Sequence, residues 1–388
     1  MTVMVTLGPP TLSLRKTLLM PRGRRISLTV AGLVVTFCLL EGLVRFCVLG
    51  PGTLFAADPD IGKVPMRGTH VLWGTEGYGR TAYSGNGEIA TPFTGGPSVV
   101  VIGDSHTEAL QVDDAAKFVS VAETELRRRG QVFDLHNLGF SGGTIADYVR
   151  LGPAVMSRYR PVAVVIQLSP EDFGAETFEA DHLNRFEKES DGALRLVHRD
   201  LGVGSPSLGA RVKHAFALVN YSELRFLRIA ERRAHAASAP GAESDAAPAQ
   251  ALQWDTVPRE LGLLRQAYPD VPVILLLLPF VPRVQTDTVI TDDPDYQRLL
   301  ATIRSTIHGY SGWQVLDPLS AFQSLAERRM LPRGFANSRP GTGHLNTIGH
   351  RVVGHLLADA LSAIRPSSAS FPNQDVVAGS VPDPPRVR

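Results

Sequence analysis

Five short apolar runs recur along the chain between residues 99 and 316, with helical patterns between them. Each run holds four to eight residues, is rich in β-branched side chains and does not alternate with polar positions. The runs are Val99 to Ile102, Val132 to Leu135, Val162 to Leu168, Val271 to Leu278 and Trp313 to Leu316. Runs of this kind are typical of parallel strands that are covered on both faces.

The intervening segments show the periodicity of amphipathic helices. The clearest runs from Asp114 to Arg129 and is followed by Gly130, and the last begins after Asn346. Strands that alternate with helices form right-handed crossovers and a parallel sheet between two helix layers. We therefore predict a three-layer α/β/α sandwich of the flavodoxin-like kind, with a five-stranded, mainly parallel sheet. Ligands of such sheets bind at the carboxyl ends of the strands.

An apolar segment at residues 26–50 precedes this pattern and is long enough to cross a membrane as a helix. Its two charged residues, Glu41 and Arg45, are spaced to pair on one helical face. Basic residues without acids stand before it: Arg15, Lys16, Arg22, Arg24 and Arg25. The positive-inside rule places residues 1–25 in the cytoplasm and the remainder on the far side. A cleaved signal peptide is the alternative, but "LFAA" at residues 54–57 is a poor cleavage site.

The rest of the chain divides into segments by composition. Residues 51–97 are rich in Gly, Thr and aromatic residues without clear periodicity, and are expected to form a loop-dominated lead-in. Residues 98–365 form the α/β domain, interrupted at about 175–258 by a hairpin turning at Asp191-Gly192, an amphipathic helix over residues 222–233 and an Ala/Pro/Ser-rich stretch. Residues 366–388 have many prolines and are expected to be disordered.

Composition excludes several classes of function. The chain has 388 residues and a formal net charge of +1, so it has no large positive field, and no motif, for binding nucleic acid. Both cysteines, Cys38 and Cys47, lie in the apolar N-terminal segment, so the domain has no thiol for a disulfide, a thiolate metal site or nucleophilic catalysis. We expect no cofactor and no metal.

The stretch "GDSH" places Ser105 directly after the first predicted strand. A serine hydroxyl becomes a nucleophile only when a positioned base takes its proton. Among eleven histidines, His344 stands in the Gly-flanked loop "GTGHLN" before the final helix, where it can reach the edge of the sheet. His350 and His355 lie within that helix and are expected to be packed or exposed.

Backbone N–H groups in a glycine turn can stabilise the oxyanion that such an attack creates. The segment "NLGFSGG" after the second predicted strand offers Gly139, and the N–H of Ser105 at the start of its helix is another donor. Asp104 is expected to be structural, with its carboxylate shaping the turn.

The blocks "GDSH", "NLGFSGG" and "GHLNTIGH" together resemble the motifs of the SGNH/GDSL hydrolase superfamily. More narrowly, the chain resembles bacterial members anchored in the inner membrane by an N-terminal helix with a Glu-x-x-x-Arg pattern. The resemblance implies that Ser105 is the nucleophile, that His344 is the general base, and that the N–H groups of Ser105 and Gly139 belong to the oxyanion hole. Members hydrolyse esters or transfer acyl groups without a metal.

Two positions depart from that pattern. Glu171 stands in "QLSPEDF" where the superfamily has an oxyanion-binding asparagine, so either Glu171 points away or Ser169 substitutes for it. Gly341 stands where an acid usually orients the histidine. Candidates to replace that acid are a backbone carbonyl and three acids after the fourth strand: Asp292, Asp293 and Asp295.

The resemblance favours a membrane-anchored serine esterase, and the envelope location makes O-acyl groups of glycans its expected substrates. Two alternatives remain open: an acyltransferase that modifies such a polysaccharide, and a catalytically degenerate binding or assembly module for it. A nucleotide-binding Rossmann domain is disfavoured, because "GDSHTE" does not supply its Gly-x-Gly-x-x-Gly turn.

Overall fold

A computed structural model describes most of the α/β domain and parts of the segments before and within it. The described residues are 22–44, 55–58, 62–65, 70–74, 76–84, 88–89, 94–179, 182–199, 216, 218–219, 222, 252–285 and 288–364. Residues 1–21, most of the predicted helix over 222–233 and the tail 366–388 lie outside them.

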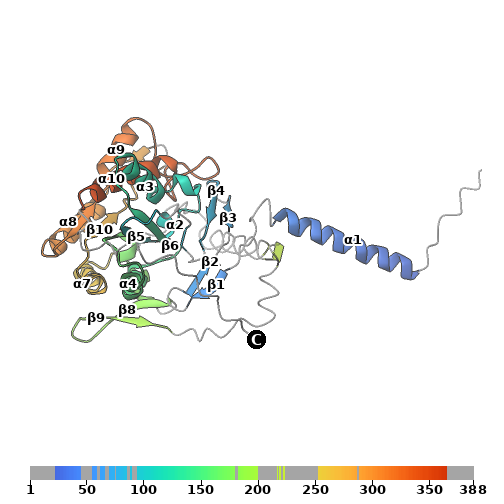
Figure 1. Ribbon diagram of the computed structural model, residues 1–388, viewed down its shortest axis with the longest axis horizontal. Helices are drawn as coiled ribbons and strands as arrows, with labels where there is room; N and C mark the ends of the chain where they lie inside the picture. The colour runs from blue at the N-terminus through green and yellow to red at the C-terminus, as the bar shows by residue number, and fades with distance from the viewer. Residues whose placement is uncertain are drawn as a thin grey trace, which may run out of the picture.

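Five parallel strands form the central sheet, which confirms the predicted α/β/α sandwich (Figure 1). Their spatial order is β13-β10-β7-β5-β6. The strands are β5 (Ser98–Gly103), β6 (Asp134–Gly139), β7 (Ala163–Leu168), β10 (Val273–Leu277) and β13 (Trp313–Leu316). The β6 strand begins two residues later than the apolar run predicts and continues to Gly139, because Asn137 to Gly139 pair with Val101 to Gly103 of β5.

Helices cover both faces of the sheet and bury two separate cores. Val100 and Ile102 of β5 face one core, which is completed by α4 (Ile145–Tyr159), α7 (Val257–Ala267) and α8 (Pro294–Ile307). Val99 and Val101 face the other, which is completed by α3 (Phe118–Arg128), α9 (Leu319–Glu327) and α10 (Thr347–Ser362). Because neighbouring side chains on β5 enter opposite cores, its run is continuously apolar, as the sequence pattern requires.

The lead-in does not form only loops. It contains two antiparallel pairs: β1 (Phe55–Asp58) with β2 (Gly62–Pro65), and β3 (His70–Trp73) with β4 (Gly79–Ala82). The β4 strand is held by the short 3-10 helix Asp114–Ala116 that precedes α3: Asp114 accepts the Ala82 N–H, and the buried Lys117 ammonium donates to Thr81. Strands of only four residues are too short to show a clear alternating pattern, and the contacts that hold β4 come from residues more than 30 positions away.

The insertion contains the predicted hairpin. Strands β8 (Asn184–Lys188) and β9 (Leu194–His198) pair antiparallel, and Gly192 in their turn has a φ of 82°. Before them lie two 3-10 helices, Pro170–Phe173 and Ala175–Phe178, and after β10 comes the antiparallel pair β11 (Arg283–Gln285) and β12 (Thr288–Ile290).

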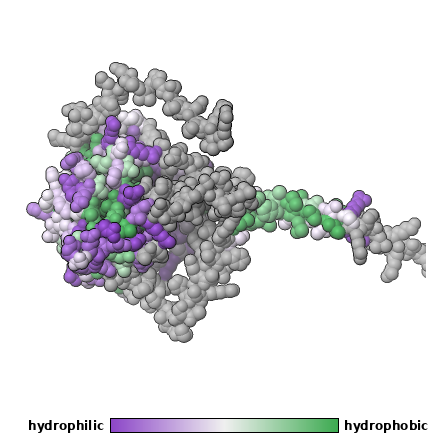
Figure 2. All heavy atoms as spheres, turned by 90° about the horizontal axis from the view of Figure 1, so that it is seen from below, coloured by the Kyte–Doolittle hydropathy of each residue, from purple (hydrophilic) through white to green (hydrophobic). Residues whose placement is uncertain are grey.

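The N-terminal helix α1 (Arg22–Leu43) projects away from the α/β domain (Figure 1). It is long and apolar enough to cross a membrane, and its apolar side chains are exposed along its length (Figure 2). It begins before residue 26, and residues 45–50 of the predicted span lie outside the described part of the chain. Glu41 accepts the Leu218 N–H at 2.9 Å, while its predicted partner Arg45 is not among the described residues.

Candidate active site

Ser105 is the first residue of the one-turn helix α2 (Ser105–Glu108), directly beyond the carboxyl end of β5. Asp104 caps this helix, because its carboxylate accepts the His106 N–H at 2.7 Å. The Asp104 N–H in turn donates to Gln167 Oε1 on β7 at 3.1 Å. Asp104 therefore shapes the turn that presents Ser105, which is the structural role the sequence predicts.

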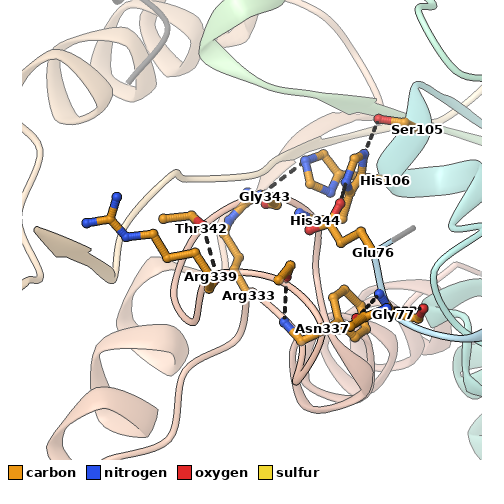
Figure 3. Close-up of polar contacts among 12 residues, drawn as sticks. Glu76, Gly77, Ser105, His106, Arg333, Asn337, Arg339, Thr342, Gly343 and His344 are labelled. Carbon is orange, nitrogen blue, oxygen red and sulfur yellow. Dashed lines mark hydrogen bonds and ion pairs between the residues drawn. The ribbon is translucent and has the colours of Figure 1, made fainter. Parts of the chain in front are cut away.

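The structure brings His344 to Ser105 although the two are 239 positions apart along the chain. His344 Nε2 lies 2.9 Å from Ser105 Oγ (Figure 3). Both side chains are partly exposed, so an attacking hydroxyl and its base are accessible from solvent. The pair that the sequence singles out thus has the geometry of a nucleophile and its general base.

Glu76 is the acid that orients His344, and sequence analysis missed it. Its Oε2 lies 2.6 Å from His344 Nδ1, and its Oε1 accepts the His344 backbone N–H at 3.0 Å. Burial acts to raise the pKa of Glu76, but its hydrogen bonds to His344 and the charges of His344 and Arg333 outweigh burial and lower it. Glu76 therefore stays ionised and holds the proton of His344 on Nδ1, which leaves Nε2 free to accept from Ser105.

The acids proposed from the sequence do not perform this role. Asp293 caps α8 by accepting the Tyr296 N–H at 3.1 Å, and Asp292 accepts the Asp293 N–H at 3.0 Å. Asp295 belongs to the first turn of the same helix. The sequence points to these acids because they follow a strand of the sheet, whereas Glu76 lies in the lead-in and carries no motif.

Glycines in the His344 loop make room for Glu76. Gly341, in the place of the usual acid, and Gly343 have φ values of 74° and 72°. A Cβ on Gly343 would lie 2.2 Å from Glu76 Oε1, which is far inside van der Waals contact. The loop thus accepts its acid from a different segment of the chain because it offers no side chain at the point of contact.

Asn337 fastens the turn that carries Glu76 to the same loop region (Figure 3). Its Oδ1 accepts the Gly77 N–H at 2.7 Å, and its Nδ2 donates to the carbonyl oxygens of Gly77 at 3.0 Å and Gly74 at 3.2 Å. One side chain therefore ties both ends of the Glu76 turn to the segment before His344.

The Gly139 N–H, predicted to bind the oxyanion, already has an acceptor within the chain. Gly139 is the last residue of β6, and its N–H donates to Asn137 Oδ1 at 2.9 Å. A Cβ on Gly139 would lie 2.2 Å from the Glu108 backbone nitrogen, so the glycine allows β6 to approach α2 closely.

Gly142, three residues later, has the features expected of Gly139. It is exposed, has a φ of 80°, and its N–H donates to no acceptor in the described part of the chain. The buried Glu108 of α2 accepts from both the N–H and the hydroxyl of Ser141, and so holds this turn beside the helix that begins with Ser105. The Ser105 N–H, at the start of α2, likewise has no acceptor among the described groups.

Ser169 does not replace the missing asparagine. It is buried, and its hydroxyl and N–H both bond Asp172 Oδ2, at 3.1 and 2.7 Å, in a capping box. Glu171 is exposed and lies close enough to the buried Arg333 for its charge to favour the protonated guanidinium. Solvent and this positive charge compensate the carboxylate at a place where an uncompensated one would repel an oxyanion.

The helical histidines have the packing roles expected for them. His350 is buried, its Nδ1 accepts the Phe118 N–H at 3.3 Å, and its ring stacks on Phe118. Burial lowers the pKa of His350 to about 3, so this side chain is neutral. His355 is exposed on the same helix.

No family model and no curated protein sequence matches the chain. Similar solved structures include TesA, at 14% identity and a TM-score of 0.35, which covers 69% of this chain and 99% of that chain. The acetyl xylan esterase AlAXEase is similar at 18% identity and a TM-score of 0.37, over 68% of this chain and 99% of that chain. A lipase/acylhydrolase from Enterococcus faecalis is similar at 14% identity and a TM-score of 0.36, over 68% and 95%. Similarity at these values assigns no activity to this chain.

Proposed function

We propose that the protein is a membrane-anchored serine esterase that hydrolyses ester bonds through an acyl-serine intermediate. The observation that carries this proposal is the continuous relay from Glu76 through His344 to Ser105, with contacts of 2.6 and 2.9 Å. An ionised acid, a correctly oriented imidazole and an accessible hydroxyl in one line are what nucleophilic acyl transfer requires. This relay disfavours the alternative of a degenerate binding module.

In the first half-reaction Ser105 Oγ attacks the ester carbonyl while His344 Nε2 takes the hydroxyl proton. The C–O bond to the alcohol then breaks, and His344 returns that proton to the departing alkoxide. In the second half-reaction His344 deprotonates a water molecule, whose oxygen attacks the acyl carbon; the bond from that carbon to Ser105 Oγ then breaks, and His344 returns the proton to Ser105 Oγ as the acid departs. Glu76 stabilises the imidazolium in both halves.

The oxyanion formed in each half-reaction is assigned to the N–H groups of Ser105 and Gly142. Both are backbone donors without an acceptor among the described residues: Ser105 begins α2, and Glu108 of α2 holds the turn that contains Gly142. Removing one donor of this kind commonly lowers kcat by ~10² to 10³.

The proposed substrates are O-acyl groups on glycans of the bacterial envelope, reached from the outer side of the inner membrane. Support comes from α1, whose arginines Arg22, Arg24 and Arg25 precede the apolar stretch, and from the positive-inside rule.

The test is serine-directed labelling of the full chain in detergent with a fluorophosphonate, alongside hydrolysis of p-nitrophenyl acetate. We expect the wild type to be labelled at Ser105 and to hydrolyse the ester, and Ser105→Ala to do neither. The matched control is Ser169→Ala. The Ser169 hydroxyl bonds Asp172 at the start of a 3-10 helix, so its removal should leave labelling at Ser105 intact. Absence of labelling in a folded wild type would overturn the proposal.

A further inference from the structure

Arg333 is the largest fully buried side chain among the described residues, with 2% of its surface exposed. Its guanidinium bonds residues of three different segments, two of which are the chain neighbours of Ser105 and His344 (Figure 3). Its backbone is also anchored, because Arg333 and Leu345 form an antiparallel bridge.

Nη1 of Arg333 bonds both the residue that follows Ser105 and the residue that precedes His344. One hydrogen points to His106 Nε2 at 3.1 Å, and the other to the Gly343 carbonyl oxygen at 2.8 Å. His106 directly follows Ser105, and Gly343 directly precedes His344. Nη2 donates to the Pro279 carbonyl oxygen beyond β10 at 2.7 Å, which fixes the guanidinium plane to the sheet.

The contact also determines the state of His106. A guanidinium can only donate hydrogen bonds, so His106 Nε2 is the unprotonated nitrogen and the ring is neutral. Burial and the nearby charge of Arg333 both lower the pKa of His106 well below its ordinary value. The rings of His106 and His344 lie 5.0 Å apart, so a neutral His106 adds no repulsion when His344 becomes protonated during the reaction.

Arg333 remains charged in this environment. Burial lowers its pKa to about 10, opposed by the charges of Asp104, Glu171 and Glu76. It forms no direct ion pair with any carboxylate that the structure describes. A buried cation without a direct ion pair costs stability, which is the expected signature of a residue kept for function rather than for folding.

We propose that Arg333 is a positioning residue of the active site, which sets the spacing of Ser105 and His344 by bonding the residues next to each of them with one nitrogen. The inference rests on the proposed function for its consequence, since the spacing matters only when the pair performs catalysis. Because Arg333 does not reach solvent, it acts on the reacting pair and not on the bound substrate.

The test compares Arg333→Met and Arg333→Lys with the wild type, after thermal unfolding has shown which variants are folded. We expect kcat to fall by ~10 to 10² in Arg333→Met, while KM stays within about threefold of the wild-type value. This pattern is expected when the lost interaction stabilises the transition state and not the bound substrate. Fluorophosphonate labelling should slow by the same factor. Arg333→Lys keeps the positive charge but loses the planar guanidinium, so its kcat is expected to lie between those of the wild type and Arg333→Met. The matched control is Arg328→Met, an exposed arginine in the preceding turn, which should behave as the wild type.

A second variant keeps the inference falsifiable if Arg333→Met fails to fold. Free guanidinium at tens of millimolar should restore part of the kcat lost in Arg333→Ala and none in Arg328→Ala. A folded Met, Lys or Ala variant with wild-type kcat would overturn the inference, as would a loss confined to KM.

Imidazole ¹⁵N spectra of the full chain separate this inference from the proposed function, because they do not depend on turnover. We expect the His344 ring signals to shift in Arg333→Lys and to stay in place in Arg328→Met. If the wild type fails to hydrolyse esters but this shift appears, the esterase proposal fails while the positioning role stands. An unchanged His344 signal in folded Arg333 variants contradicts the positioning role.

Discussion

Glu76 bonds His344 at two atoms, so a single side chain determines both the tautomer and the direction of the imidazole. In Glu76→Gln the ring loses the negative charge that stabilises its protonated form. We expect kcat to fall by ~10² to 10⁴ with little change in KM, by analogy with the serine-protease template in which the acid is neutralised. Ester hydrolysis measures this, and Asp292→Asn is the control because Asp292 lies in the loop before α8, where it accepts the N–H of the neighbouring Asp293.

The same carboxylate predicts a sign for the pH dependence of stability. Since hydrogen bonds to His344 hold the pKa of Glu76 in the folded protein below its ordinary value, the carboxylate stabilises the folded state above that ordinary value, and this contribution is lost as the pH falls through the lower, folded pKa. The difference in free energy of unfolding between wild type and Glu76→Gln should therefore shrink on acidification.

For the kcat prediction, a lower kcat in Asp292→Asn than in Glu76→Gln would contradict the assignment of Glu76 as the acid.

The β3–β4 pair brings Glu76 to the site, and its docking contacts decide where the acid stands. Asn337 makes three hydrogen bonds to the turn between these strands. Asn337→Ala should free that turn, lower kcat by ~10-fold or more and reduce the free energy of unfolding by about 1 to 2 kcal/mol. The measurements are steady-state hydrolysis and urea unfolding.

The control for this prediction is Asn184→Ala, which removes hydrogen bonds to Asp147 and His198 near the hairpin, outside the active site. It should reduce stability by a similar amount and leave kcat unchanged. Equal losses of kcat in both variants would mean that the Asn337 effect is general destabilisation and not release of Glu76.

At the scale of the whole molecule, the core on the α4 and α7 side contains a destabilising acid. Glu260 of α7 is fully buried, and the nearby Thr256 side chain offsets the effect of burial on its carboxyl group only in part. Burial raises the pKa of Glu260 to about 8. Between pH 4.5 and 8 the unfolded chain binds fewer protons at this residue than the folded one, so its contribution destabilises increasingly as pH rises.

Glu260→Gln removes this titration with little change in shape. Relative to the wild type, the free energy of unfolding of the variant should rise with pH by up to about 1.4 kcal/mol per pH unit across that window. Urea unfolding at several pH values measures the difference, with the exposed Glu327→Gln as control. A difference that does not depend on pH would show that Glu260 is not held protonated in the fold.

The sequence by itself determined the strand and helix alternation, the sandwich, the apolar N-terminal helix and the pairing of Ser105 with His344. These follow from local patterns: continuous apolar runs require strands covered on both faces, and glycine-flanked polar residues after strands collect at one edge of the sheet. Only the tertiary structure decided that Glu76 is the acid, that the Gly139 N–H donates to Asn137, and that Arg333 bonds the residues beside Ser105 and His344. Each of these contacts depends on how close two backbones or side chains come after packing, and Glu76 and His344, 268 positions apart, leave no periodic trace of that distance in the chain.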